Sequence, residues 1–178
     1  MGTSEPFGDY VNSNKRQLGQ TDKQWITLSA ARSMAILTMY GKPGFDLTSK
    51  PVESVPPETT YDEAMAEVPA LMAMVVREFT GEFAARSAIT APAVLAGIGA
   101  LLHHATSWTR EPKLSREQVI ELLAQVHWDR GEQWNGVGAH TTPKGGLSFA
   151  GGVKDQGHAV YEALLNEYSD TGRQIRGR

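Results

Sequence analysis

The residues best suited to chemistry lie in the last third of the chain, in a segment rich in tryptophan and glycine. Trp128 and Trp134 flank Arg130, and Lys144 and Lys154 follow among glycines. No helical or strand period explains this composition. Indole rings bury large apolar faces while their N–H groups seek acceptors, so the tryptophans are predicted to anchor a loop on the rest of the fold. The segment is either a packed loop with a hairpin, or a surface that binds nucleic acid or a partner protein.

The cations of this segment indicate phosphate contact as the chemistry of the second alternative. Lysine and arginine side chains supply most of the sequence-independent affinity for DNA. Arg130, Lys144 and Lys154 are therefore predicted DNA contacts. A second candidate surface is formed by three cations nearer the start of the chain, Lys15, Arg16 and Lys23.

The overall charge limits how DNA could be bound. The chain has 20 acidic and 17 basic residues, a formal net charge of -3 and a pI of about 5.9. Six acidic residues lie from Glu58 to Glu82, where Arg77 is the only cation. Such a balance excludes attraction of DNA by the whole surface, so binding would require a local basic patch.

Sequence motifs for catalysis and metal binding are absent. The chain has no phosphate-binding loop motif, no dinucleotide-binding glycine motif, no zinc-protease motif and no nucleophile elbow. His103 and His104 are adjacent and point about 100° apart on a helix, so they cannot chelate one ion together. Ser148, Asp155 and His158 have residue types that a catalytic triad uses, but no sequence motif indicates that they lie close together in the fold. No metal and no cofactor is expected, and the chain alone is more consistent with a binding role than with an enzyme.

Composition also bears on the compartment. The sequence contains no cysteine and therefore no disulfide framework, which agrees with a cytoplasmic protein. The start of the chain has no apolar signal segment. The longest apolar run, residues 88–102, is rich in alanine and glycine and is typical of a core helix. No membrane partner is expected.

The first half of the chain is predicted to hold an extended arm over residues 1–24 and two helices. Thr27 can cap a helix that ends at Gly41. Residues 41–59 contain four prolines and are predicted to form a loop. Thr60 and Glu63 form a capping box for the second helix, which Pro69 is expected to kink or divide.

The second half is predicted to hold three helices and a hairpin. Residues 90–106 are apolar on nearly every side, and the two glycines in this helix indicate close approach by a neighbour. Ser115 caps the next helix, a weak hairpin pattern covers residues 137–150, and Asp155 can cap a last helix that ends near Tyr168. The predicted fold is mainly α: a compact bundle of about five helices with a small C-terminal β-hairpin. A single helical domain spans residues 25–168, and residues 169–178 form a basic tail.

Several segments together resemble the C-terminal half of DndB-like proteins, the DGQHR-domain proteins associated with DNA phosphorothioate modification and phage defence. They are TDKQWITLSAARSMAILTMYG, AITAPAVLAGIGALL, HWDRGEQWNG and KGGLSFAGGVKDQGHAVYEALL, in that order. The paired tryptophans of the family's segment near the end correspond to Trp128 and Trp134, with Arg130 between them, and the segment reads W-D-R-G-E-Q-W here. The resemblance implies a DNA-associated helical module that supports or regulates modification, with a protein partner carrying the DGQHR half, since the naming motif itself does not occur here.

Two other functions stay open. The acidic second helix and the glycine-rich loop could bind another protein chain without DNA, as an assembly module of a defence or phage complex. Alternatively, the chain could be part of a nuclease that uses His140 or His158. Affinity for duplex DNA that falls as the salt concentration rises would favour DNA association over assembly. Loss of cleavage activity on replacement of either histidine would favour the nuclease.

Overall fold

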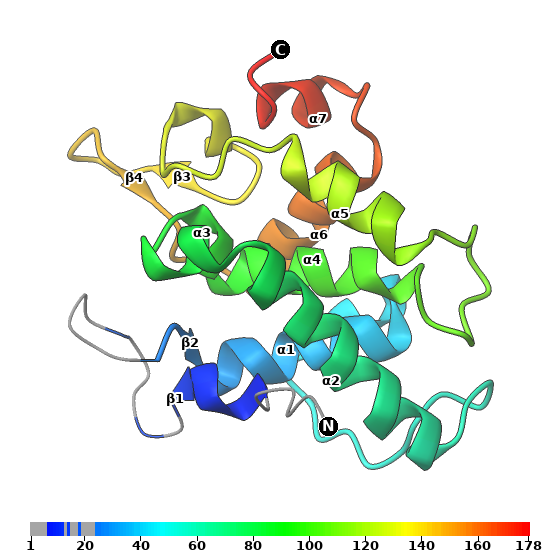
Figure 1. Cartoon of the computed structure of the whole chain (residues 1–178). Coiled ribbons are helices and arrows are strands. Elements are labelled where there is room, and N and C mark those ends of the chain that lie inside the picture. Colours follow the sequence, from blue (N-terminus) through cyan, green and yellow to red (C-terminus); the bar gives the residue numbers. More distant parts are fainter. Residues whose placement is uncertain (1–6, 13, 15–17, 19–23) are drawn as a thin grey trace.

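The protein is mainly α-helical, as the sequence predicts (Figure 1). The structure is a computed structural model that describes residues 7–12, 14, 18 and 24–178. Lys15, Arg16 and Lys23, the predicted contacts near the start of the chain, lie outside the described residues. Seven helices occur in the described part: α1 (Leu28–Tyr40), α2 (Tyr61–Glu78), α3 (Thr80–Ala84), α4 (Pro92–His103), α5 (Arg116–Ala124), α6 (Val153–Leu165) and α7 (Asp170–Gln174).

Helix α4 is the centre of the fold, packed between α1 and α6. All of its residues from Ala93 to His103 are buried, as expected for a helix that is apolar on every side. It is only 12 residues long. Among the helices of the described part, none is both long and apolar enough to cross a membrane.

Glycines allow α1 and α6 to approach α4 closely. A Cβ atom on Gly99 would lie 2.4 Å from the carbonyl oxygen of Met34 in α1. A Cβ atom on Gly97 would lie 2.6 Å from the Val160 side chain and 3.0 Å from the Gly157 carbonyl oxygen, both in α6. These distances leave no room for a side chain. The predicted use of the two α4 glycines for close helix approach is confirmed.

The predicted helix starts are confirmed at three positions. The Thr27 hydroxyl accepts from the Ala30 amide at the start of α1. Thr60 with Glu63, and Ser115 with Gln118, form complete capping boxes at the starts of α2 and α5. Each cap satisfies amides that lack helical partners. Pro69 neither ends nor divides α2, which continues through it.

Two short strand pairs flank the helices. β1 (Val11–Asn12) pairs in parallel with β2 (Ile26–Thr27), and β3 (His140–Thr141) pairs antiparallel with β4 (Leu147–Ser148). The second pair is the predicted C-terminal hairpin. β1 belongs to the segment that the sequence assigns to an extended arm, whereas β2 follows that segment, and a 3-10 helix (Phe7–Tyr10) precedes β1. Tyr10 stacks on Trp25 at 5.0 Å between ring centroids, so this part of the arm packs on the domain.

The C-terminal third differs from prediction at its helix ends. The N-cap of α6 is Gly152, and Asp155 lies in the first turn and not at the cap. The helix ends at Leu165, before the expected Tyr168. Residues 169–178 are not a free tail, because Ser169 caps α7 and Arg176 is buried. The physical reason is that α6 and α5 present carbonyl oxygens that the Arg176 guanidinium binds.

His103, at the end of α4, is expected to make stability depend on pH. Its ring is buried and its Nδ1 donates to the Thr38 carbonyl oxygen at 3.0 Å. Burial lowers the pKa of His103 below its ordinary value of 6.5, and the bond to Thr38 opposes this only in part. In the unfolded chain the imidazole therefore takes up a proton at higher pH than in the folded protein.

The free energy of unfolding should accordingly fall as the pH drops below about 6.5, by up to about 1.4 kcal/mol per pH unit from this group. Urea unfolding at pH 7.5 and at pH 5.5 measures the fall. His103→Gln should reduce the difference between the two pH values. An unchanged difference in that variant would mean that other groups set the pH dependence.

Candidate functional site

Trp128 and Trp134 are core residues. Their rings stack at 5.6 Å between centroids, and Trp134 is fully buried. The Trp128 indole donates to the Leu123 carbonyl oxygen, and the Trp134 indole donates to those of His127 and Asp129. The segment that contains them is therefore folded inward, with buried Val137 and Ala139 after it. Between the buried rings, Asp129, Arg130 and Glu132 stay exposed, and the following hairpin also faces solvent.

Arg130 connects this segment to its surroundings. Its Nε donates to the Arg86 carbonyl oxygen at 2.9 Å, and one terminal nitrogen donates to the Thr90 hydroxyl at 3.2 Å. The guanidinium lies 4.8 Å from the centre of the Phe149 ring, a cation–π distance. Partial burial lowers the pKa of Arg130. Its contacts position the base of the hairpin, and three of its five N–H donors remain for other partners.

Lys144 lies in the exposed turn of the hairpin. The turn is closed by a bond from the Thr142 amide to the Gly146 carbonyl oxygen, and Gly145 supplies the positive φ of 83° that it needs. Within the described part of the chain, no hydrogen bond or ion pair involves the Lys144 ammonium. The hairpin thus holds one cation in solvent.

Lys154 lies elsewhere, in the first turn of α6. Its ammonium pairs with the Asp46 carboxylate at 2.5 Å. This hydrogen bond raises the pKa of Lys154 and lowers that of Asp46. Across the residues that the structure describes, no bond joins any two of Arg130, Lys144 and Lys154. The three predicted contacts therefore have three different surroundings.

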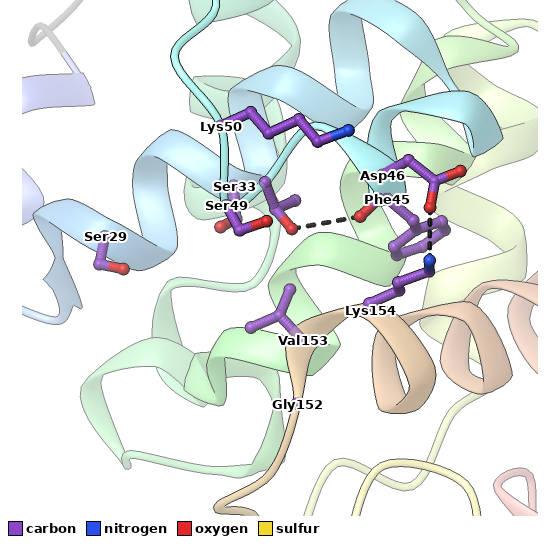
Figure 2. A pocket seen from close by; sticks show the side chains of 10 residues that line it. Ser29, Ser33, Phe45, Asp46, Ser49, Lys50, Gly152, Val153 and Lys154 are labelled. Atoms are coloured by element: carbon purple, nitrogen blue, oxygen red, sulfur yellow. Dashed lines mark hydrogen bonds and ion pairs between the residues drawn. The ribbon is translucent and has the colours of Figure 1, made fainter.

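The Lys154–Asp46 pair lies at the edge of a polar hollow between α1, the loop after it and the start of α6 (Figure 2). The hollow has a volume of about 460 Å³ and opens to solvent. Hydroxyl residues, two lysines and one aspartate line it together with apolar surface; the lining consists of Ser29, Ser33, Phe45, Asp46, Thr48, Ser49, Lys50, Gly152, Val153 and Lys154. Hydroxyl and ammonium donors around an open cavity suit an anionic ligand.

The loop that forms one wall of the hollow is held by side-chain bonds. Arg32 of α1 donates to the carbonyl oxygens of Thr48 and Lys50, and the Thr48 hydroxyl donates to that of Phe45. Phe45 itself is buried against Gly157 of α6. The loop belongs to the proline-rich region that the sequence predicts as a connection between two helices. Its contacts with α1 and α6 hold it in place.

The start of α6 forms the opposite wall. Gly152 offers no side chain to cap the helix, and within the described residues no bond engages the backbone amides of the next three residues. These amides carry the positive end of the helix dipole. Lys50, Ser33 and Asp46 were not predicted as site residues. No local motif marks them, because the fold brings them together with residues about a hundred positions later.

A second polar cluster is buried and structural. His104 donates from Nδ1 to the Pro112 carbonyl oxygen, and its Nε2 lies 2.8 Å from both the Tyr161 hydroxyl and a Glu111 carboxylate oxygen. Burial first, and then the Glu111 charge, raises the pKa of Tyr161. His103 bonds to Thr38 instead, so the two histidine rings have separate partners, as the sequence indicates. The cluster ties the loop after α4 to α6.

The residues considered for a nuclease are dispersed. His140 is exposed in β3, whereas His158 packs against Phe45 and lies 3.7 Å from the Glu162 carboxylate. The Ser148 hydroxyl accepts from the Ala150 amide, and no bond among the described residues links it to Asp155 or His158. In the same part of the chain, no three histidine or acidic side chains are placed to hold a metal ion.

Comparison with known proteins adds no relative. No protein-family model matches the sequence, and searches of curated proteins and of solved structures find no match.

Proposed function

We propose that this chain is a helical DNA-associated module that supports or regulates DNA phosphorothioate modification and phage defence. Its resemblance to DndB-like proteins supports this role, with a partner chain carrying the DGQHR half. The observation that carries the proposal is the polar hollow, where Lys50 and Lys154 lie beside hydroxyl groups and an uncapped helix start. These are groups that bind phosphate oxygens. Such a role belongs in the cytoplasm and needs no cofactor and no catalytic residue in this chain.

The hollow and the hairpin would contact different phosphates of the DNA. Lys50 and Lys154 would contact one phosphate, and the exposed Lys144 would contact another. Arg130 would act mainly by positioning the hairpin, since it is already bonded to Arg86 and Thr90. Contacts to phosphate orient a protein on DNA without reading its sequence, so any sequence preference would come from the partner.

Titration of the whole chain with a fluorescent random duplex, over a series of salt concentrations, tests the proposal. Binding should be measurable at low salt and should weaken as salt rises. Lys50→Ala and Lys144→Ala should each weaken binding to all sequences and reduce the salt slope by about one. Arg173→Ala is the matched control, because this exposed cation lies on α7, which Figure 1 shows well away from α1. Absence of binding at low salt would refute DNA association by this chain.

The assembly module remains the second candidate because of one observation on α2. Tyr61 and Met65 are 66% and 43% exposed, one turn apart on a helix that also carries acidic residues. Large exposed apolar side chains are enriched at protein interfaces. Loss of partner association on Tyr61→Ser with DNA affinity unchanged would favour assembly. The nuclease would require measurable cleavage that His140→Ala or His158→Ala abolishes while helical content is kept.

A further inference from the structure

We propose that the hollow binds a single phosphate group at the start of α6. The site consists of the first free amides of α6, the Ser33 hydroxyl and the Lys50 ammonium. The inference rests on the proposed function in that it names the ligand chemistry of the same hollow. The phosphate could belong to a DNA backbone or to a free phosphate ester, and the shared recognition chemistry is the same.

The first observation is that the helix start is accessible. Gly152 is the N-cap of α6, and a Cβ atom placed on it would meet nothing within 4 Å. The helix has 13 residues, long enough for its dipole to act at this end. The space beside the Gly152 α-carbon, at the start of the helix, is therefore empty.

The second observation is the Ser33 side chain. The residue is 6% exposed and lines the hollow, where Figure 2 labels it next to Ser49. Within the described part of the chain, no hydrogen bond engages the Ser33 hydroxyl. Among the described residues, the only side-chain nitrogen or oxygen atom that is fully buried without a partner is Arg176 Nε, so the Ser33 oxygen stays accessible from the hollow that it lines. A ligand oxygen in the hollow would supply the missing partner.

The charges of the hollow favour an anion but limit its affinity. Lys50 and Lys154 are cationic, whereas Asp46 is anionic and already pairs with Lys154. Asp155, in the first turn of α6, adds a second carboxylate near Lys154. The Asp46 carboxylate thus competes with a phosphate for the Lys154 ammonium. Replacing Asp46 by asparagine should strengthen phosphate binding, a change opposite in sign to that expected for the lysines.

The shape of the hollow selects the phosphate and not a base. Its volume of about 460 Å³ exceeds one phosphate group and leaves room for the attached ester. Its one aromatic residue, Phe45, is 4% exposed and cannot stack on a nucleobase. The site would therefore accept a phosphate from any nucleotide sequence.

The test is titration of the isotopically labelled full chain with inorganic phosphate at constant ionic strength, followed by amide chemical shifts. The amides of Ser33, Val153 and Lys154 should shift together with one dissociation constant. Lys50→Ala and the charge-neutral Ser33→Ala should weaken binding several-fold, and Asp46→Asn should tighten it. Arg173→Ala, an equal loss of charge outside the hollow, should leave the constant unchanged.

Shifts spread over the surface, or equal weakening by Arg173→Ala and Lys50→Ala, would overturn the site. Thermal unfolding of each variant shows whether it is folded. Because Lys50 is exposed, Lys50→Ala still tests the site if the buried Ser33→Ala change disturbs folding. Titrations with a short duplex and with a nucleoside monophosphate then distinguish the sources of phosphate. DNA binding without phosphate shifts in the hollow overturns this inference alone. Phosphate binding in the hollow without DNA binding overturns the proposed function alone and supports the site.

Discussion

Replacement of Gly99 by alanine is expected to lower the free energy of unfolding by about 2–3 kcal/mol. The new Cβ atom would lie 2.4 Å from the Met34 carbonyl oxygen and 3.0 Å from the Leu37 Cβ atom. The first of these is a backbone atom, so α1 and α4 must move apart and lose contact along their length. Domains of this kind are stable by only about 5–15 kcal/mol, so the loss is a large fraction of the total.

Urea unfolding of the wild type and the variant measures this change. Gly81→Ala is the matched control, because a Cβ atom there meets nothing within 4 Å and the residue lies in α3 with ordinary backbone angles. The control should alter stability by less than about 1 kcal/mol, in either direction. A Gly99→Ala protein as stable as the control would show that the α1–α4 contact is looser than described.

Replacement of Arg176 by methionine should cost about 3 kcal/mol of stability. Arg176 is 3% exposed, and its guanidinium donates to four carbonyl oxygens at 2.9–3.1 Å. The acceptors belong to the end of α6, to α5 and to α7; they are Ala163, Leu164, Leu122 and Gly172. Methionine keeps an apolar stem of similar length, so the loss measures the bonds and not the packing.

Arg173→Met is the control for this experiment. Arg173 is also cationic and lies three residues earlier, but it is exposed. Its replacement should change stability by less than about 0.5 kcal/mol. The two variants have equal net charge, so equal unfolding curves would contradict the role of Arg176 as the bond donor that joins three helices.

Local patterns in the sequence predict the parts of the fold that depend on near neighbours. Thr60 and Glu63 are three residues apart, and their capping box follows from that spacing alone. Gly97 and Gly99 in an otherwise apolar helix indicate close packing, since they weaken the helix unless a neighbour uses the space. The all-round apolar character of α4 likewise indicates its central position.

Features that depend on distant partners could not be predicted in this way. Arg176 looks like a tail cation until α5 and α6 bring carbonyl oxygens to it. Lys154 follows Lys144 by only ten residues in the sequence. In the fold it lies in the first turn of α6, where its ammonium pairs with Asp46 and not with the hairpin. Trp128 and Trp134 stack on each other in the core, and sequence alone left open whether they face inward.

The central claim is that phosphate oxygens bind in the hollow at the start of α6, and one comparison of amide shifts tests it most directly. Inorganic phosphate and a short DNA duplex are added separately to the labelled full chain, and the affected residues are mapped. The account predicts that both ligands shift Ser33, Val153 and Lys154, with Asp46→Asn strengthening both effects. Shifts that instead map to the exposed face of α2 around Tyr61 and Met65, with the hollow unaffected, would contradict it.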